Sequence, residues 1–363
     1  MVDSGMGQDL TVAATPEISC VAVIPAFLIN KVEEMKKIFI TEGDVNGIGS
    51  ELVLKFFSEG NYAEDNIYTI IGSRRIFDRT AVVLNLPSSQ YSDISQDSVA
   101  DLKTPGLYFL DIPYGCSELN FGTATAEAGK LSGDAIKTGV KLAQLTGGAL
   151  VTCPINKYSL NLGGYNYPGH TEFIAELLNT DNFLMILDGG VIKVALVTTH
   201  LAIKNVPAAL SSDLIYKKGR ILCESLRKDY GLESPEIAVL SLNPHAGDGG
   251  LFGDEEARII APAVARLNED AASCRAKFTG PLAADTAFTK KHLESTDAFL
   301  VMYHDQGLIP LKLLSFGSAV NFTAGLPIVR TSPDHGTAYD IAGKGVADIN
   351  SFKNALEKAL SLR

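Results

Sequence analysis

Basic residues and long apolar runs are both scarce in this chain of 363 residues. Lysine and arginine number 31 against 42 aspartates and glutamates, so the formal net charge is −11. This acidic balance argues against a nucleic-acid partner, and an anionic ligand would need a locally basic pocket. No segment approaches the roughly 20 consecutive apolar residues that span a bilayer. The sequence therefore predicts a soluble, cytoplasmic protein without a membrane partner.

Paired cysteines and the common nucleotide-binding motifs are also missing. The number of cysteines is odd, and no two of them form a C-x-x-C pair; they are Cys20, Cys116, Cys153, Cys223 and Cys274. This pattern is typical of reduced thiols and excludes a disulfide framework or a zinc ribbon. Segment 43–49 is rich in glycine, but it has neither the G-x-G-x-x-G spacing nor a Walker G-K-[ST]. Taken alone, it predicts a tight turn between a strand and a helix.

Residues 1–34 differ in character from the rest of the chain. Their apolar stretch, 18–29, is interrupted by Pro25 and has no basic start, so it does not have the pattern of a secretory signal. A strand-like pattern resumes at 36–41, just after Met35. We therefore expect residues 1–34 to be an N-terminal extension outside the core, whose deletion leaves activity and melting temperature nearly unchanged.

Strand-like and helix-like segments alternate from about residue 36 onward, which indicates an α/β fold. Helical periodicity is clear at 124–145, 211–230 and 254–267, and in a last helix that we expect Ser351 to cap. The expected strands are 38–41, 67–71, 107–110, 149–152, 184–187, 194–198, 237–242 and 298–302.

Three of these apolar runs are followed by a histidine: His200, His245 and His304. Short runs of this kind are typical of buried parallel strands, and ligands bind beyond the carboxyl ends of such strands. Three strands would then deliver three imidazoles to one edge of a sheet, which indicates a divalent-metal site with open positions for a substrate. His170 and His335 lie in other Gly- and Pro-containing segments, and for each of them the residues alone predict a capping or hydrogen-bonded imidazole.

Carboxylates and cations lie close to these histidines in the sequence. Asp305 follows His304 directly, and Asp285 lies in the segment 280–286. Each could be a metal ligand, orient a histidine or act as a general base, with turn capping as the alternative. Lys312 and Arg330 lie downstream, and in so acidic a chain we expect them to hold a phosphate or carboxylate.

Ten short motifs run in order from about residue 36 to the end of the chain. They are GDVNGIG at 43–49, PINK at 154–157, YPGHTE at 167–172, TTH at 198–200, LNPHAGDGG at 242–250, GPLAADT at 280–286, MYHDQG at 302–307, VN at 320–321, GLP at 325–327 and RTSPDHGT at 330–337. Together they resemble the 4-hydroxythreonine-4-phosphate dehydrogenases of vitamin B6 synthesis. Two departures are the N-terminal extension and segment 44–46, where the family more often has Pro and Ala.

The resemblance implies a fold like that of isocitrate and isopropylmalate dehydrogenases, in which two α/β domains flank an active-site cleft. Residues 35–163 and 338–363 would form the first domain. Residues 164–337 would form the second, which contains most of the metal and substrate residues. The family works as a homodimer in which the partner subunit completes the active site.

The resemblance also assigns site residues. A divalent metal would be held by His200, His245 and His304, two from one subunit and the third from the other. Zinc is the expected ion, with magnesium and cobalt as alternatives. The substrate residues carried over from the family motifs are His170, Thr171, Lys312, Asn321 and Arg330. NAD or NADP binds in this family without a Rossmann fingerprint, so no cofactor-binding residue is assigned.

The implied reaction oxidises 4-phosphohydroxy-L-threonine to 2-amino-3-oxo-4-(phosphooxy)butanoate, which decarboxylates to 3-amino-2-oxopropyl phosphate. Asp305, Asp285 or a bound water would be the general base. One alternative is the same chemistry on a 4-phosphorylated sugar acid, 4-phosphoerythronate or 4-phosphothreonate. Others are a metal-dependent hydrolase or aldolase that needs no NAD, and a metal- or solute-binding protein without chemistry.

Overall fold

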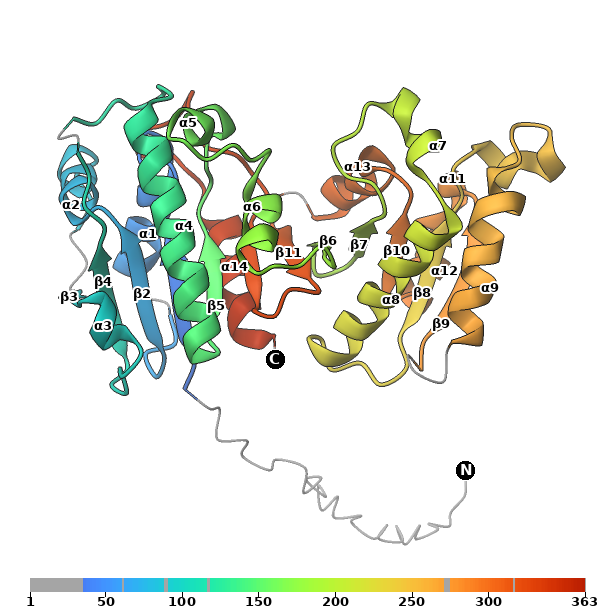
Figure 1. The fold of residues 1–363 in the computed structure, drawn as a ribbon, viewed down its shortest axis with the longest axis horizontal. Coiled ribbons are helices and arrows are strands. Elements are labelled where there is room, and N and C mark those ends of the chain that lie inside the picture. Colours follow the sequence, from blue (N-terminus) through green and yellow to red (C-terminus); the bar gives the residue numbers. More distant parts are fainter. Residues whose placement is uncertain are drawn as a thin grey trace, which may run out of the picture. The chain divides into compact units, whose positions relative to one another are not determined.

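The computed structural model describes residues 35–60, 62–87, 91–115, 118–270, 275–315 and 317–362. Residues Met35–Arg363 form a compact unit of their own, coloured from blue to red in Figure 1. The predicted N-terminal extension lies outside the described residues and stays a prediction. Within the described ranges, no helix is both long enough and apolar enough to cross a membrane.

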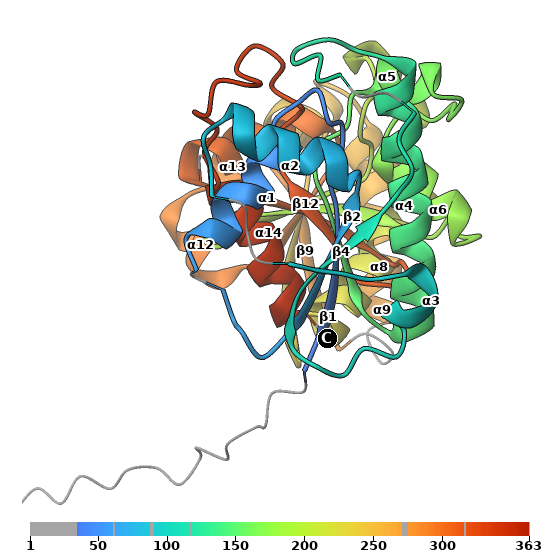
Figure 2. The same cartoon turned by 90° about the vertical axis from the view of Figure 1, so that its left-hand side faces the viewer.

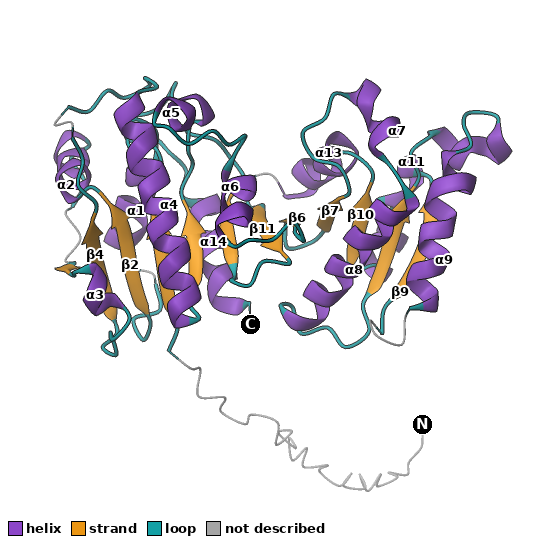
Figure 3. Cartoon of the chain, in the orientation of Figure 1, coloured by secondary structure: helices purple, strands orange, loops and turns teal. Residues whose placement is uncertain are grey.

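Twelve strands of the described residues form one sheet (Figure 3), in the order β3-β4-β2-β1-β5-β12-β11-β6-β7-β10-β8-β9. Strands far apart in the sequence lie side by side, since β12 pairs with β5. The strands are β1 (Lys37–Thr41), β2 (Ile67–Gly72), β3 (Ser92–Asp93), β4 (Gly106–Asp111), β5 (Ala149–Thr152), β6 (Leu184–Asp188), β7 (Lys193–Leu196), β8 (Glu236–Leu240), β9 (Lys277–Leu282), β10 (Ala298–Val301), β11 (Val320–Ala324) and β12 (Arg330–Pro333).

The sheet contains two parallel blocks joined by antiparallel strands. In the first block β4, β2, β1, β5 and β12 are mutually parallel, and in the second β7, β10, β8 and β9 are. The pairs β12–β11, β11–β6 and β6–β7 between them are antiparallel. Within each block the strands end at a common edge, where polar ligand-binding residues can collect.

Helices cover both faces of the sheet (Figure 2). Successive side chains of a strand point to opposite faces. Ile38 and Ile40 of β1 accordingly pack in one apolar cluster with residues of α1 and α14, and Phe39 packs in another with residues of α4. The helices are α1 (Gly49–Ser58), α2 (Arg74–Val83), α3 (Gln96–Val99), α4 (Ala126–Thr146), α5 (Lys157–Leu162), α6 (His170–Leu177), α7 (Val206–Ala209), α8 (Ser212–Lys228), α9 (Ala261–Glu269), α11 (Ala284–Ala287), α12 (Lys290–Ser295), α13 (His304–Ser315) and α14 (Asn350–Ser361), with short turns η1 (Ile203–Asn205), η2 (Pro244–Gly250) and η3 (Glu256–Ile260).

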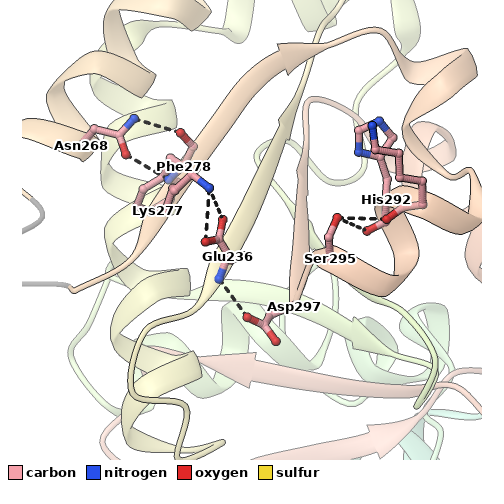
Figure 4. A network of polar contacts seen from close by, with 8 residues as sticks. Glu236, Asn268, Lys277, Phe278, His292, Ser295 and Asp297 are labelled. Carbon is pink, nitrogen blue, oxygen red and sulfur yellow. Dashed lines mark hydrogen bonds and ion pairs between the residues drawn. The ribbon is translucent and has the colours of Figure 1, made fainter.

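Polar contacts fix β9, the last strand of the sheet, to its neighbours (Figure 4). Lys277 Nζ lies 3.1 Å from Glu236 Oε2 on the adjacent strand β8. The Phe278 amide donates to Asn268 Oδ1 of α9 over 3.0 Å, and the Phe278 carbonyl accepts from Asn268 Nδ2 over 2.9 Å. These contacts occupy groups of an edge strand that would otherwise be open to pairing with another chain.

The predicted α/β fold class is confirmed, and every expected strand and helix overlaps an observed one. Strands β3, β9, β11 and β12 were not predicted. The expected cap of the last helix is wrong. Helix α14 begins at Asn350 with Ile349 as its N-cap, and Ser351 lies inside its first turn. There the Ser351 hydroxyl donates to the Ala319 carbonyl and accepts from the Asp334 amide, so it ties the helix to the loop after β12.

Candidate active site

A cavity of about 300 Å³ lies where the two parallel blocks and the antiparallel strands between them meet. The first block contributes Thr152 at the end of β5 and Arg330 on β12. The second contributes His200, after β7, and His304, after β10. The antiparallel strand β11 adds Asn321, and the start of α6 adds a further segment, 169–172. This position is the one expected for the ligand site of an α/β sheet.

Arg330 is the most deeply buried charge in the wall of this cavity, with 1% of its surface exposed. Its guanidinium donates to Thr152 Oγ1 over 2.7 Å and to Thr323 Oγ1 over 3.1 Å, and its Nε has no partner among the described residues. Burial lowers the pKa of Arg330 to about 10, a shift that the negative charge of Glu172 partly opposes. A buried cation that pairs only with hydroxyl groups is costly unless an anion joins it.

Three other polar atoms in the cavity wall are buried and have no hydrogen-bond partner in the described part of the chain: His170 Nε2, His335 Nε2 and Asn321 Oδ1. Burial, together with the nearby charge of Arg330, holds the pKa of His170 well below its usual value, so this imidazole is neutral. His335 Nδ1 lies 3.0 Å from the Gly336 carbonyl, which can only accept, so the nitrogen donates. Buried polar atoms are nearly always paired, so this group of orphaned atoms indicates a ligand site.

The predicted substrate residues are brought together with one exception. His170, Thr171, Asn321 and Arg330 line the cavity, whereas Lys312 does not. Lys312 is half exposed on α13, and its Nζ lies 3.7 Å from Oδ2 of Asp334, which does line the cavity. Lys312 therefore lies one side chain away from the cavity.

The three histidine-bearing strands are neighbours, since β10 pairs in parallel with both β7 and β8. The rings of His200 and His304 lie 5.7 Å apart, and both line the cavity. Burial, followed by the charges of Lys157 and His304, lowers the pKa of His200, which favours the neutral form that binds metals.

Convergence of all three imidazoles within one chain is not observed. No group of three His, Cys, Asp or Glu side chains in the described ranges lies close enough together to hold a metal ion. His245 lies on η2, five residues beyond the end of β8, in a run with left-handed backbone from His245 to Gly249. Its ring lies beside Phe252, and its Nδ1 is 3.8 Å from Asp285 Oδ2. Adjacent strand ends therefore bring His200 and His304 together, but they do not bring His245 to the same place.

Asp305 and Asp285 each lie beside one of the histidines and not in the cavity wall. Asp305 Oδ1 is 2.7 Å from His304 Nδ1, and Asp285 lies beside His245. A carboxylate in this position orients an imidazole and leaves its other nitrogen free. Their assignment as general base stays a prediction.

The glycine-rich segment 43–49 is packed within the protein. Glu42, just before it, accepts from Ser50 Oγ over 2.6 Å and from the Ser73 amide over 2.9 Å. A Cβ on Gly43, whose φ is +76°, would lie 2.4 Å from the Pro154 carbonyl oxygen. The tight backbone approach explains the glycine, as expected for a turn between strand and helix.

Four charged or titratable residues of the cavity wall have no role predicted from the sequence, namely Lys157, Glu172, Asp334 and His335. All four lie in motifs of the resemblance, but the sequence has no signal for their place in the cavity wall. The cavity, with its buried guanidinium and orphaned polar atoms, is typical of an α/β protein with a site for a small anionic molecule.

Comparison with known proteins identifies the family. The family described as pyridoxal phosphate biosynthetic protein PdxA matches residues 64–359. The chain is 41% identical over 335 residues to a 4-hydroxythreonine-4-phosphate dehydrogenase of Sulfurihydrogenibium sp. (strain YO3AOP1), covering 91% of this chain and 99% of the relative. It is 42% identical over 325 residues to one of Desulfosudis oleivorans, covering 88% and 94%.

A solved structure agrees with these sequence matches. The crystal structure of a 4-hydroxythreonine-4-phosphate dehydrogenase from Klebsiella pneumoniae has a TM-score of 0.81 and 38% identity, covering 90% of this chain and 98% of that chain. The chain belongs to the PdxA family and is an oxidoreductase, as the resemblance predicted.

Proposed function

We propose that this chain oxidises the secondary hydroxyl of 4-phosphohydroxy-L-threonine with NAD, and that the resulting β-keto acid loses CO2. The principal support is the buried guanidinium of Arg330, which faces the cavity without an acidic hydrogen-bond partner among the described residues. A phosphate or carboxylate supplies the missing negative charge, and Arg binds such groups through two parallel hydrogen bonds.

The phosphate end of the substrate would lie against Arg330, with His170, Thr171 and Asn321 as hydrogen-bonding neighbours. The orphaned atoms of His170 and Asn321 support a ligand here. Asn321 Oδ1 can only accept, so it would take a proton from a hydroxyl of the substrate or from a protonated phosphate oxygen. A phosphate oxygen can only accept when it is fully ionised, so contact with His170 Nε2 requires a proton on one of the two groups. Lys312 would offset the negative charge of Asp334, whose Oδ2 is 3.7 Å from its Nζ, and so reduce the repulsion between Asp334 and the phosphate.

The residues of this chain fit part of a divalent-metal site. Two imidazoles bound to one metal through bonds of about 2.1 Å have ring centres roughly 5 to 6 Å apart, and those of His200 and His304 are 5.7 Å apart. Asp305 occupies Nδ1 of His304 and leaves its Nε2 for the metal. When bound, a divalent metal lowers the pKa of a coordinated hydroxyl and stabilises negative charge on the product oxygen.

The third ligand in this proposal is His245 of the partner subunit in a homodimer. Apolar side chains exposed around the three histidines support such an interface. Two follow His200, two follow η2, and three lie on α13, which begins at His304; they are Leu201, Ile203, Leu251, Phe252, Ile309, Leu313 and Leu314. The division of residues 35–363 into two domains around the cavity is part of the same proposal.

A substrate panel with NAD and NADP tests the function. We expect NADH formation with 4-phosphohydroxy-L-threonine, its loss on treatment with a chelator, and its recovery when zinc, cobalt or magnesium is added. Turnover restricted to 4-phosphoerythronate or 4-phosphothreonate would replace the substrate and keep the reaction type. Full turnover by metal-free protein would refute the metal site.

A further inference from the structure

Glu172 is a carboxylate in the wall of a cavity whose other features favour anions. It lies in the first turn of α6, two residues after His170, and is partly buried. Among the described residues it forms no ion pair within 4 Å, although its charge opposes the lowering of the pKa of both His200 and Arg330. The other carboxylate of the wall, Asp334, lies 3.7 Å from Lys312. Glu172 is therefore the carboxylate available to a cationic group of a ligand.

A cation lies close to Glu172 without pairing with it. Both side chains flank Gly169, where a Cβ would lie 3.4 Å from Glu172 Oε2 and 3.7 Å from Lys157 Cε. Lys157 also lines the cavity. An ammonium and a carboxylate that both lie beside Gly169 in the cavity wall complement the two charges of an α-amino acid, the ammonium matching its carboxylate and the carboxylate its ammonium. A 2-hydroxy acid carries the carboxylate but offers nothing cationic to Glu172.

We propose that Glu172 determines substrate specificity by binding the 2-ammonium group, while Lys157 binds the carboxylate shared by amino and hydroxy acids. This inference rests on the proposed function and adds a recognition site for the end of the substrate away from the phosphate. A carboxylate that binds an ammonium loses its partner when the ligand carries a hydroxyl, so the site discriminates between the two classes.

Glu172 could also serve the fold alone. An acidic residue in the first turn stabilises a helix through the helix dipole, and α6 has glycine as its N-cap without a side-chain cap. The same carboxylate could instead weaken anion binding at Arg330 from a distance. These roles predict equal effects on amino and hydroxy substrates, whereas recognition of the ammonium predicts unequal ones.

The test compares 4-phosphohydroxy-L-threonine with 4-phosphothreonate, which has a hydroxyl in place of the amino group. For Glu172→Gln in the metal-loaded protein, we expect kcat/KM on the amino substrate to fall about ten- to hundredfold. The hydroxy compound, followed as a substrate or as a competitive inhibitor, should bind as well as before or better. Lys157→Met should weaken both compounds alike.

Glu176→Gln is the matched control, since Glu176 lies on the same helix, is exposed, bonds Tyr167 and is outside the cavity. Melting temperature and metal content are measured for each variant, and Glu172→Asp, which keeps the charge, should retain part of the preference. Equal losses on both compounds, or a wild-type preference for the hydroxy compound, would overturn the inference. Wild-type protein that turns over neither compound would overturn the proposed function, and this inference with it.

Discussion

Replacing Arg330 with methionine should stabilise the free protein while removing its affinity for phosphorylated ligands. The fall in the pKa of Arg330 from its usual value to about 10 corresponds to about 3 kcal/mol of unfavourable free energy for the buried charge. Both values lie far above neutrality, so the penalty is fully present at pH 7 and shrinks only as the pH rises beyond 10. Methionine gives up two hydrogen bonds to the hydroxyls of Thr152 and Thr323, at about 1 kcal/mol each.

The net expectation is a gain of about 1 kcal/mol in the free energy of unfolding, which thermal denaturation at pH 7 would detect as a small rise in melting temperature. Inorganic phosphate should raise the melting temperature of the wild-type protein and leave that of the variant unchanged. Arg330→Lys should keep part of the response to phosphate. A variant that is strongly destabilised, yet still protected by phosphate, would show that Arg330 has a structural role only.

Two further predictions concern buried carboxylates outside the cavity. Burial raises the pKa of Glu42 to about 7, so its stabilising contribution is complete below pH 4.5 and is lost as the pH rises through 7. The free energy of unfolding of Glu42→Gln, relative to that of the wild type, should therefore rise by up to about 3 kcal/mol between pH 5 and pH 8. Parallel pH dependences of the two melting temperatures would contradict this. Although burial opposes it, Lys358, 2.8 Å away, helps to hold the pKa of the buried Asp188 below its usual value. Lys358→Met should lower the free energy of unfolding, measured in urea at pH 7, by about 3 kcal/mol. A decrease below about 0.5 kcal/mol would show that the ion pair contributes little to stability.

Hydrophobic patterning predicted the fold class because most strands of both parallel blocks are short, continuous apolar runs. It failed for β12, whose sequence is Arg-Thr-Ser-Pro. This strand is buried even though it is polar, because the hydroxyls of Thr152 and Thr323 accept from its guanidinium. Partners of this kind come from strands distant in sequence, so no local pattern reveals them.

The histidine motifs predicted that three imidazoles converge, and the structure brings the rings of His200 and His304 within 5.7 Å of each other. The position of His245 depends on a left-handed backbone run that follows β8, and glycine content alone does not define such a path. The sequence named Arg330 as a candidate because cations are few. The sequence could not show that the guanidinium of Arg330 is buried without an acidic hydrogen-bond partner. This burial depends on how α6 and β11 pack around the side chain.

The central claim is that a buried guanidinium recognises the phosphate of a substrate that the chain oxidises. The most direct test measures NADH formation by the wild-type protein and by Arg330→Met, each with 4-phosphohydroxy-L-threonine and with unphosphorylated 4-hydroxy-L-threonine. The wild type should strongly prefer the phosphorylated compound, and the variant should lose this preference. A variant that keeps the wild-type preference would contradict recognition of the phosphate by Arg330.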